Sequence, residues 1–245
     1  MWSFMRLAVI SDIHGNTEAF GAVLADIEIS GVDAMVCLGD VIGYGPEPNE
    51  TISMVCANNI PTVMGNHELG IINREYLSRF NPAAYRSMLI TIDMLNDESM
   101  HFVNKLETSL VSYSSRFVHG FPPESPTIYM IELDTKGIQD AYAKYEERIC
   151  FIGHTHSLRI IESDGNSIEH GILQRGKTEL CADNRYIINA GSVGQPRDGD
   201  NHAKYIIWDT SNDSIEAKYI SYDIDSVVNK IMKAGFPEIN ARRLL

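Results

Sequence analysis

The stretch LAVISDIHGN, residues 7–16, joins an apolar, β-branched run to a group of polar residues. Residues 7–10 are predicted to form a short buried strand, and Asn16 is a suitable cap for a helix that ends at Gly31. Asp12 and His14 follow the strand two residues apart, so in an extended segment both side chains would project from the same side. The stretch therefore predicts a strand–loop–helix unit whose loop can chelate a metal ion.

The next two apolar runs, residues 34–38 and 62–64, are predicted strands separated by a helix that begins at Pro48. This β-α-β-α-β order predicts parallel strands buried between helices, with their carboxyl ends at one edge of the sheet. Asp40 and Asn66 lie just beyond these ends, and Asp40 is expected to follow a central strand. Because open α/β sheets place ligands at this edge, we expect the polar residues of all three loops to meet.

Residues 69–110 are predicted to form a helical excursion over the mouth of the site, with helices near residues 83–95 and 100–106 and no strand signal. The excursion carries three arginines in an otherwise acidic chain. These are Arg74, Arg79 and Arg86. Each could contact a substrate phosphate or could belong to a solvated helix face.

The second half of the chain returns to sheet at residues 111–118, just before the motif HG that holds His119. An amphipathic helix is predicted over residues 138–145, and the strand at residues 149–152 leads to the motif GHTH. Two antiparallel hairpins follow, with strands at residues 158–162 and 167–172 and at residues 205–208 and 215–220. A last helix is expected to begin near Asp223 or Asp225 and to end at Gly235 and Pro237.

The composition indicates one cytoplasmic domain over residues 1–245. The apolar content of 44% is enough for a sizeable core, and no repeat or linker divides the chain. Residues 1–10 are predicted to be a first strand and not a signal peptide, and no apolar run approaches the roughly 20 residues of a membrane helix. The four cysteines have no CxxC spacing and are predicted to be small buried hydrophobes in a reducing compartment: Cys37, Cys56, Cys150 and Cys181.

The net charge of −13 excludes some partners. A nucleic-acid duplex or an anionic membrane surface would be repelled by the bulk of the chain. A small anion held directly by metal ions is still compatible with this charge, because the ions dominate the local field. We therefore expect a small phosphate-ester substrate, and the oligomeric state is not predicted.

Seven oxygen and imidazole ligands stand at predicted strand ends, with no thiolate among them. They are Asp12, His14, Asp40, Asn66, His119, His154 and His156. The set is too large for one tetrahedral zinc ion and, with one bridging residue, suits two divalent ions about 3.5–4 Å apart. Two such ions outweigh the two carboxylates, so the site would lower the pKa of a bridging water and attract a phosphate ester. The ligand types suit Mn²⁺, Fe²⁺, Zn²⁺ or Ni²⁺.

The motifs DIH, GD, GNHE, HG and GHTH, in this order and spacing, resemble those of the calcineurin-like metallophosphoesterase superfamily. The resemblance implies a mixed α/β fold in four layers, α-β-β-α, with the helical excursion over the site. It also implies one ion held by Asp12, His14, Asp40 and His156, and a second held by Asp40, Asn66, His119 and His154. The same resemblance implies that His67 does not bind a metal ion. It would instead face the scissile phosphate and act as a general acid or charge stabiliser.

The segment NAGSVGQPRDGD, residues 189–200, resembles a bacterial branch of the family that includes YfcE-like and related small phosphodiesterases. Arg197 is the only basic residue of this loop and is a candidate substrate-phosphate ligand. The alternative is a surface arginine that pairs with Asp198 or Asp200. His101, His170 and His202 lie outside the motifs and are predicted to be surface residues.

Two departures from the family pattern narrow the expected function. In protein phosphatases and symmetrical dinucleoside tetraphosphatases the second motif continues GDxxDRG, whereas here Gly43 and Tyr44 replace the second Asp and the Arg. We therefore expect a two-metal hydrolase of small phosphodiesters or phosphomonoesters, in which a metal-bridging hydroxide attacks phosphorus and His67 assists the leaving group. The alternatives are a non-catalytic scaffold with this fold and a phosphatase of proteins or dinucleoside polyphosphates.

Overall fold

The computed structural model describes residues 5–245. The first strand, β1, spans Arg6–Ile10. Residues 1–4, which belong to the segment predicted as strand and not signal peptide, lie outside the described residues. Among the described residues, no helix combines the length and the apolar character needed to cross a bilayer.

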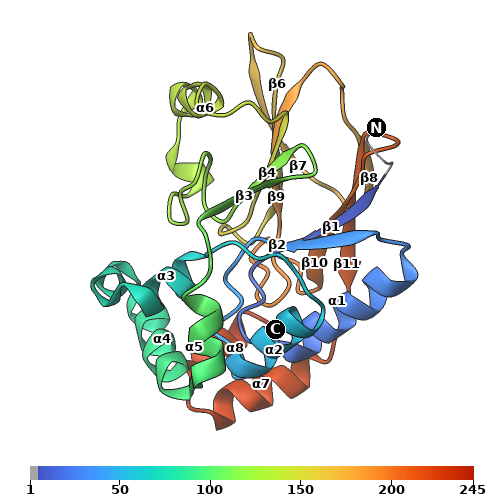
Figure 1. Cartoon of the computed structure of the whole chain (residues 1–245). Helices are drawn as coiled ribbons and strands as arrows, with labels where there is room; N and C mark the ends of the chain where they lie inside the picture. Colours follow the sequence, from blue (N-terminus) through green and yellow to red (C-terminus); the bar gives the residue numbers. More distant parts are fainter. Residues whose placement is uncertain (1–4) are drawn as a thin grey trace.

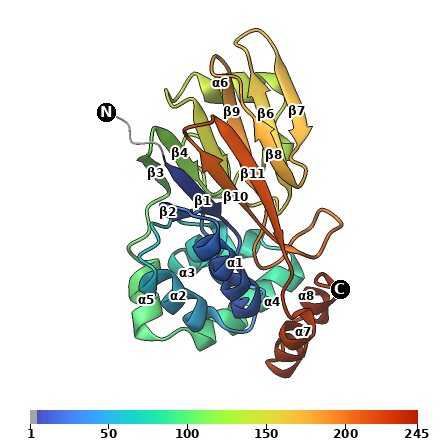
Figure 2. The same cartoon turned by 90° about the vertical axis from the view of Figure 1, so that its right-hand side faces the viewer.

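Two mixed β-sheets form the centre of the molecule (Figures 1 and 2). The five-stranded sheet has the order β2-β1-β10-β11-β8, with β2 at Ala34–Cys37, β8 at Gly176–Glu179, β10 at Ala203–Asp209 and β11 at Ser214–Ile220. The six-stranded sheet has the order β3-β4-β5-β9-β6-β7, with β3 at Ser109–Ser112, β4 at Ser115–Val118, β5 at Ile149–Ile152, β6 at Leu158–Ser163, β7 at Ile168–Ile172 and β9 at Arg185–Ala190. The pairing of β1 with β10 joins strands from the first and the last quarter of the chain in one sheet.

The α-helices are α1 at Thr17–Ile29, α2 at Pro48–Ala57, α3 at Asn66–Ile72, α4 at Pro82–Met94, α5 at Asp97–Val103, α6 at Thr135–Tyr142, α7 at Ile224–Lys233 and α8 at Glu238–Arg242. Two 3-10 helices, η1 at Arg74–Arg79 and η2 at Met130–Glu132, complete the set among the described residues. In Figures 1 and 2, α6 lies apart from the other α-helices, beside the six-stranded sheet.

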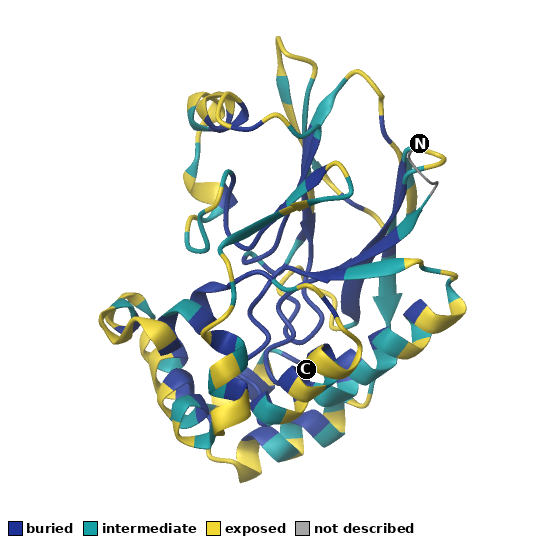
Figure 3. Ribbon diagram, viewed as in Figure 1, coloured by how far each residue is buried: buried dark blue, intermediate teal, exposed yellow. Residues whose placement is uncertain are grey.

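The alternation of side chains along the strands creates four layers. In β1, Leu7 and Val9 pack between the two sheets, whereas Ala8 and Ile10 pack against residues of α1 and α2. In β5, Phe151 lies in the core between the sheets, and Cys150 faces α6. The layers are therefore helices, five-stranded sheet, six-stranded sheet and α6, which confirms the predicted α-β-β-α arrangement. Figure 3 shows the central strands and the loops at their ends among the most buried parts of the chain, whereas edge strands such as β3, β7 and β8 are intermediate or exposed.

The expected third parallel strand at residues 62–64 is not a ladder strand. Thr62 and Val63 form only single bridges, to Cys37 and to Glu107. The segment between Pro61 and Gly65 is too short for a ladder, so β2 lies at the edge of the five-stranded sheet. The prediction that Asp40 follows a central strand was therefore wrong.

Residues 111–118 form a hairpin and not one strand. Strand β3 begins at Ser109, inside the segment predicted as a helical excursion, and pairs antiparallel with β4. The turn residues Tyr113 and Ser114 have φ values of 51° and 54°, the left-handed conformation of a mirror-image hairpin turn. The usual Asn-Gly or Asp-Gly signal of that turn is missing here.

Other differences are local. Helix α5 ends at Val103, short of the predicted residue 106, and α6 ends at Tyr142, before Tyr145. Of the four cysteines, Cys37 and Cys150 are buried as predicted, but Cys56 and Cys181 are exposed. Four α-helices and strands were not predicted, namely α3, α8, β8 and β9, and neither were the two 3-10 helices η1 and η2.

Candidate metal centre and phosphate site

The predicted ligand residues meet where the two sheets bring their strand ends together. Asp12 and His14 follow β1, and Asp40 follows β2, in the five-stranded sheet. His119 follows β4 and the GHTH histidines follow β5, in the six-stranded sheet. Asn66 is the first residue of α3. The structure therefore places all seven predicted ligands, which are at most 5% exposed, in one buried cluster.

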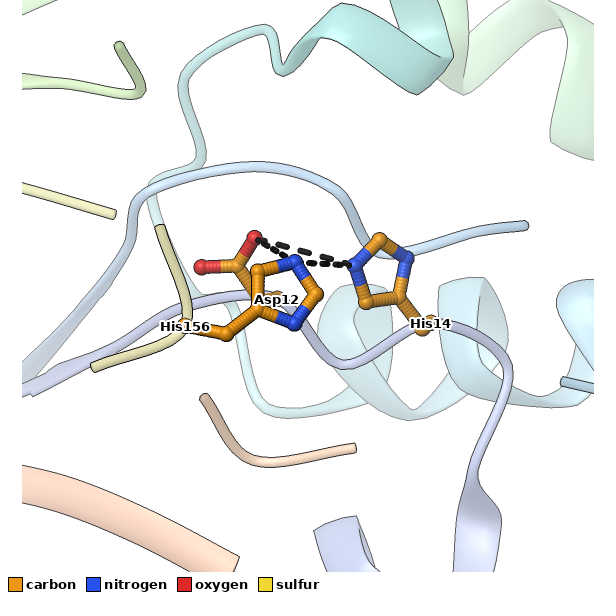
Figure 4. A group of neighbouring side chains, drawn as sticks. All are labelled: Asp12, His14 and His156. Carbon is orange, nitrogen blue, oxygen red and sulfur yellow. Dashed lines mark hydrogen bonds and ion pairs between the residues drawn. The ribbon is translucent and has the colours of Figure 1, made fainter. Parts of the chain in front are cut away.

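The first half of the cluster contains Asp12, His14 and His156. The Nε2 atoms of His14 and His156 lie 3.2 Å apart, and Oδ1 of Asp12 lies 3.2 Å from His156 Nε2 and 3.7 Å from His14 Nε2. Figure 4 shows these three groups turned toward one another from two separate loops.

The second half of the cluster is centred on His119. Its Nε2 atom lies 3.2 Å from Asp40 Oδ2, 3.2 Å from Asn66 Oδ1 and 3.2 Å from His154 Nδ1. Asp40 Oδ2 is also 3.8 Å from His14 Nε2 in the first half. Asp40 Oδ2 therefore lies within 3.8 Å of ligands in both halves, the position that a bridging ligand needs. Asp12 Oδ1 is closer to the first half, at 3.2 Å from His156, and lies 4.0 Å from His119.

Hydrogen bonds to backbone carbonyls fix the tautomers of the four ligand histidines. The Nδ1 atoms of His14, His119 and His156 donate to the carbonyls of Ile42 (2.9 Å), Leu38 (2.8 Å) and Gln195 (2.5 Å). His154 uses its other nitrogen, and its Nε2 donates to the carbonyl of Thr127 at 3.3 Å. Each ring therefore turns its other nitrogen toward the cluster, as ligand histidines do.

The ligand atoms that face one another in the cluster are arranged to bind a cation. Lone pairs on His14 and His156 point at each other, and Asp12 Oδ1 is buried without a hydrogen-bond partner among the described residues. Burial would raise the pKa of Asp40, but nearby His119 and His67 outweigh it and lower that pKa well below its ordinary value. Burial lowers the pKa of His154 to about 3, which keeps its ring neutral and able to bind a metal.

The backbone that carries the ligands is left-handed and not extended. Five of the seven ligands have positive φ, between 51° and 68°: Asp12, His14, Asp40, His154 and His156. This conformation is uncommon outside glycine and costs of order 1–3 kcal/mol per residue. Asp12 and His14 meet in the first half as predicted, although tight turns and not an extended segment aim their side chains at the cluster. The same spacing also predicts that His154 and His156 chelate together, and this was wrong, because His156 lies in the first half and His154 in the second.

Glu68, which was not predicted as a site residue, positions Asp40. Its carboxylate accepts hydrogen bonds from the backbone N–H groups of Asp40 (2.9 Å), Val41 (2.8 Å) and Gly65 (2.9 Å). Burial and then the charge of Asp40 raise the pKa of Glu68 to about 7. Asp40 Oδ1 accepts from the N–H of His67 at 2.9 Å, which turns Oδ2 toward the cluster.

His67 lies beside the cluster with its Nε2 3.8 Å from Asp40 Oδ2. Its Nδ1 atom is buried without a partner among the described residues, and burial lowers its pKa to about 3. A Cβ atom added to Gly43, which has a φ of +85°, would lie 2.0 Å from that Nδ1. The histidine ring therefore fills the space next to position 43, where an aspartate of the GDxxDRG pattern would begin.

Arg197 lies near the cluster and forms no pair with its acidic neighbours. Its guanidinium is 5.3 Å from the centre of the Tyr44 ring and donates to Gln195 Oε1 at 2.7 Å. Asp198 and Asp200 instead contact Lys204. The predicted alternative, a surface pair of Arg197 with Asp198 or Asp200, is therefore wrong, and the phosphate contact stays a prediction.

A cavity of about 250 Å³ opens above the cluster. Asp40, Asn66, His67 and the GHTH histidines line it together with Arg197. The rest of its wall was largely missed by the sequence analysis and consists of Tyr44, Tyr76, Arg79, Phe80, Asn81 and Tyr129. Tyr129 stacks on His154 with the ring centres 3.7 Å apart. No motif marks Tyr129, because it stands in the irregular segment between β4 and α6.

The helical excursion borders this cavity only through η1 and the residues after it. Arg79 lines the cavity, whereas the side chains of Arg74 and Arg86 are exposed and do not. His101 and His170 are exposed as predicted, and His202 is half-buried against Asp200. Of the three arginines, only Arg79 is therefore placed to contact a substrate.

The fold and the cluster together define a metal-dependent phosphoesterase. The calcineurin-like phosphoesterase superfamily domain matches residues 5–213, and the chain belongs to this superfamily. The predicted family is therefore confirmed, as is the prediction of a metal-dependent hydrolase.

Known relatives cover almost the whole chain. An uncharacterised protein of Methanocaldococcus jannaschii, MJ0912, is 38% identical over 97% of this chain and 96% of its own length. A metallophosphoesterase of Sphaerobacter thermophilus, solved by crystallography, is 32% identical over 99% of this chain and 98% of its own, with a TM-score of 0.86. The hypothetical protein PH1004 of Pyrococcus horikoshii shares the fold at 17% identity, over 98% and 97% of the two chains, with a TM-score of 0.77.

Proposed function

We propose that the protein is a two-metal hydrolase of small phosphodiesters or phosphomonoesters. The observation that carries this proposal is the position of Asp40 Oδ2, which faces both ligand sets at the base of a small cavity. In this proposal one ion is held by Asp12, His14, Asp40 and His156, and the other by Asp40, Asn66, His119 and His154. The ligand types suit Mn²⁺, Fe²⁺, Zn²⁺ or Ni²⁺.

When bound, such ions supply activation of a water molecule for attack on phosphorus and neutralise charge on the phosphate oxygens. Residues of the protein hold the ligand side chains in position. Carbonyl acceptors hold the ligand rings, and Glu68 holds the loop of Asp40 through three backbone N–H groups. A preorganised site of this kind needs little rearrangement during the reaction.

His67 is proposed to act on the leaving group. It lines the cavity beside Asp40 and is 1% exposed, so water competes little for its ring N–H. Donation of that N–H to the departing oxygen would stabilise the negative charge that develops there. Arg197 lines the same cavity and is proposed to contact a phosphate oxygen.

The size of the cavity supports a small substrate, because about 250 Å³ is below the usual range of pockets for drug-sized molecules. Gly43 provides a second argument, which is directed against a protein phosphatase. The protein-phosphatase pattern requires an aspartate at this position, and in this chain the ring of His67 lies too close for any side chain without movement.

The test is a substrate panel on chelator-treated protein reloaded separately with each of the four metals. Hydrolysis of bis-p-nitrophenyl phosphate or p-nitrophenyl phosphate above that of a phosphopeptide would support the proposal. Faster turnover of the phosphopeptide would contradict it, and so would the absence of hydrolysis of every compound with every metal.

A further inference from the structure

A second cavity, of about 610 Å³, opens on the other side of Arg197. It lies between the loop that follows β9 and the end of α8, and Arg197, Asp200 and Arg243 are its charged side chains. Arg197 also lines the cavity above the metal-ligand cluster. The two cavities are therefore neighbours that share one arginine.

Arg197 and Arg243 come from distant parts of the sequence but share one neutral acceptor. Oε1 of Gln195 accepts from Arg197 at 2.7 Å and lies 3.4 Å from Nη1 of Arg243, which also donates to it. Gln195 is 2% exposed and is held in place by its own backbone, whose carbonyl accepts from His156. Two like charges are thus held side by side in a chain of net charge −13.

Neither guanidinium forms an ion pair with a carboxylate within residues 5–245. The acidic residues of the loop are already engaged, because Lys204, which is fully buried, contacts Asp198 at 2.7 Å and Asp200 at 3.4 Å. Asp200 also accepts from His202 at 2.8 Å. Burial and then repulsion by Arg197 lower the pKa of Arg243, which an anion between the two guanidinium groups would offset.

Packing fixes the position of Arg243. Asn240, which is fully buried, donates to the carbonyl of Tyr44 and to Ser87 Oγ, each at 2.9 Å. Ala241 and Leu244 are buried in the small apolar core that α8 shares with α7. The short helix is thereby tied to the Tyr44 loop of the catalytic cavity and to α4, and Arg243 is half-buried at the edge of the second cavity.

We propose that Arg197 and Arg243 bind a second phosphate group of the substrate in this cavity while the ester phosphate lies over the metal centre. The inference rests on the proposed function and narrows the substrate class to phosphate esters that carry another phosphate. Paired guanidinium groups suit phosphate because each can donate two parallel N–H bonds. An ester without the second phosphate is bound more weakly but is cleaved at the same metal centre.

The binding test uses the metal-loaded full chain and inorganic phosphate, with isothermal titration calorimetry as the readout. We expect two phosphate sites in the wild type and one in Arg243→Ala. The matched control is Arg242→Ala, which removes an exposed neighbouring arginine paired with Glu238 and should keep both sites. One site in the wild type, or two in Arg243→Ala, would overturn the proposal. Arg243→Lys should restore part of the second binding event.

The substrate test compares two esters with the same leaving group: thymidine 5′-(p-nitrophenyl phosphate) and the same compound with a 3′-phosphate. We expect the wild type to have a KM lower by about 10- to 100-fold for the 3′-phosphorylated ester, the value of one charged hydrogen-bonded contact. Arg243→Ala should abolish this difference in KM, whereas the control Arg242→Ala should keep it. Equal KM values in the wild type would overturn the inference, whereas hydrolysis of neither ester would refute the proposed function and leave the calorimetric result to decide on the phosphate site.

Discussion

The metal-ligand loops and the arginine-bearing segments are built in different ways. The ligand loops directly follow buried strands, have left-handed backbone at five ligand positions, and tie each histidine to a carbonyl. The arginines stand on an exposed loop and at the end of a five-residue helix, and one neutral side chain, Gln195, joins them. The comparison indicates that local sequence determines the reaction centre, whereas contacts between distant segments determine what is bound beside it.

The largest effect is expected from Asp40→Asn, because Asp40 faces both halves of the ligand cluster. It should abolish tight binding of both ions and lower turnover by about 10³-fold or more. The matched control is Asp12→Asn, which removes a carboxylate that the proposal assigns to one ion and should therefore cost one ion. Metal content is measured by mass spectrometry on purified protein. Two tightly bound ions in Asp40→Asn would show that Asp40 is not the shared ligand.

His67→Ala should keep the metal content and lower turnover by about 10²–10⁴-fold, the contribution expected of a ring N–H that stabilises the departing oxygen. The loss should be larger for alkoxide leaving groups than for p-nitrophenolate, since a poor leaving group needs more stabilisation. If both leaving groups lose rate equally, His67 positions the phosphate and does not act on the departing oxygen.

Gly43→Ala should lower turnover by about tenfold or more without loss of metal, because the new methyl group would collide with the ring of His67. Gly165 provides a matched control, since its φ of +88° is similar to the +85° of Gly43 but no atom lies within 4 Å of its added Cβ. Both variants carry the strain of alanine at positive φ, and only Gly43→Ala should lose activity. Equal kinetic losses in the two would exclude displacement of His67 as the cause.

Gln195→Ala should have the smallest effect, a rise in KM of about tenfold with little change in kcat. The substitution removes the acceptor shared by Arg197 and Arg243 but keeps the backbone carbonyl that holds His156. Metal content, measured alongside the kinetics, should therefore not change. Loss of metal in this variant would mean that the two regions are not separable.

The sequence analysis succeeded where functional side chains directly follow a regular strand. The motifs after β1, β2, β4 and β5 identified six of the seven clustered side chains, and the motif GNHE at the start of α3 identified the seventh, Asn66. The capping role of Asn16 was also correct, since its side chain accepts from Ala19 N. The four layers also follow from the alternation of apolar residues and from the family resemblance. These features depend on neighbours in sequence, which is why they could be predicted.

The features that were missed depend on long-range contacts. Tyr129 and Arg243 reach the two cavities only because η2 and α8 pack where they do, and α8 is held by bonds from Asn240 to residues more than 150 positions away. Strand β9 is apolar but was not predicted, and the turn at Tyr113 and Ser114 has no characteristic residues. The left-handed ligand backbone was missed because Asp and His at these positions carry no conformational signal comparable to that of glycine.

The central claim is that two ions share Asp40. The direct measurement is a crystal structure of the protein loaded with Mn²⁺, with anomalous diffraction data collected at the manganese absorption edge. We predict two anomalous peaks about 3.5–4 Å apart, both within bonding distance of the Asp40 carboxylate. A single peak, or two peaks of which only one contacts Asp40, would contradict the account.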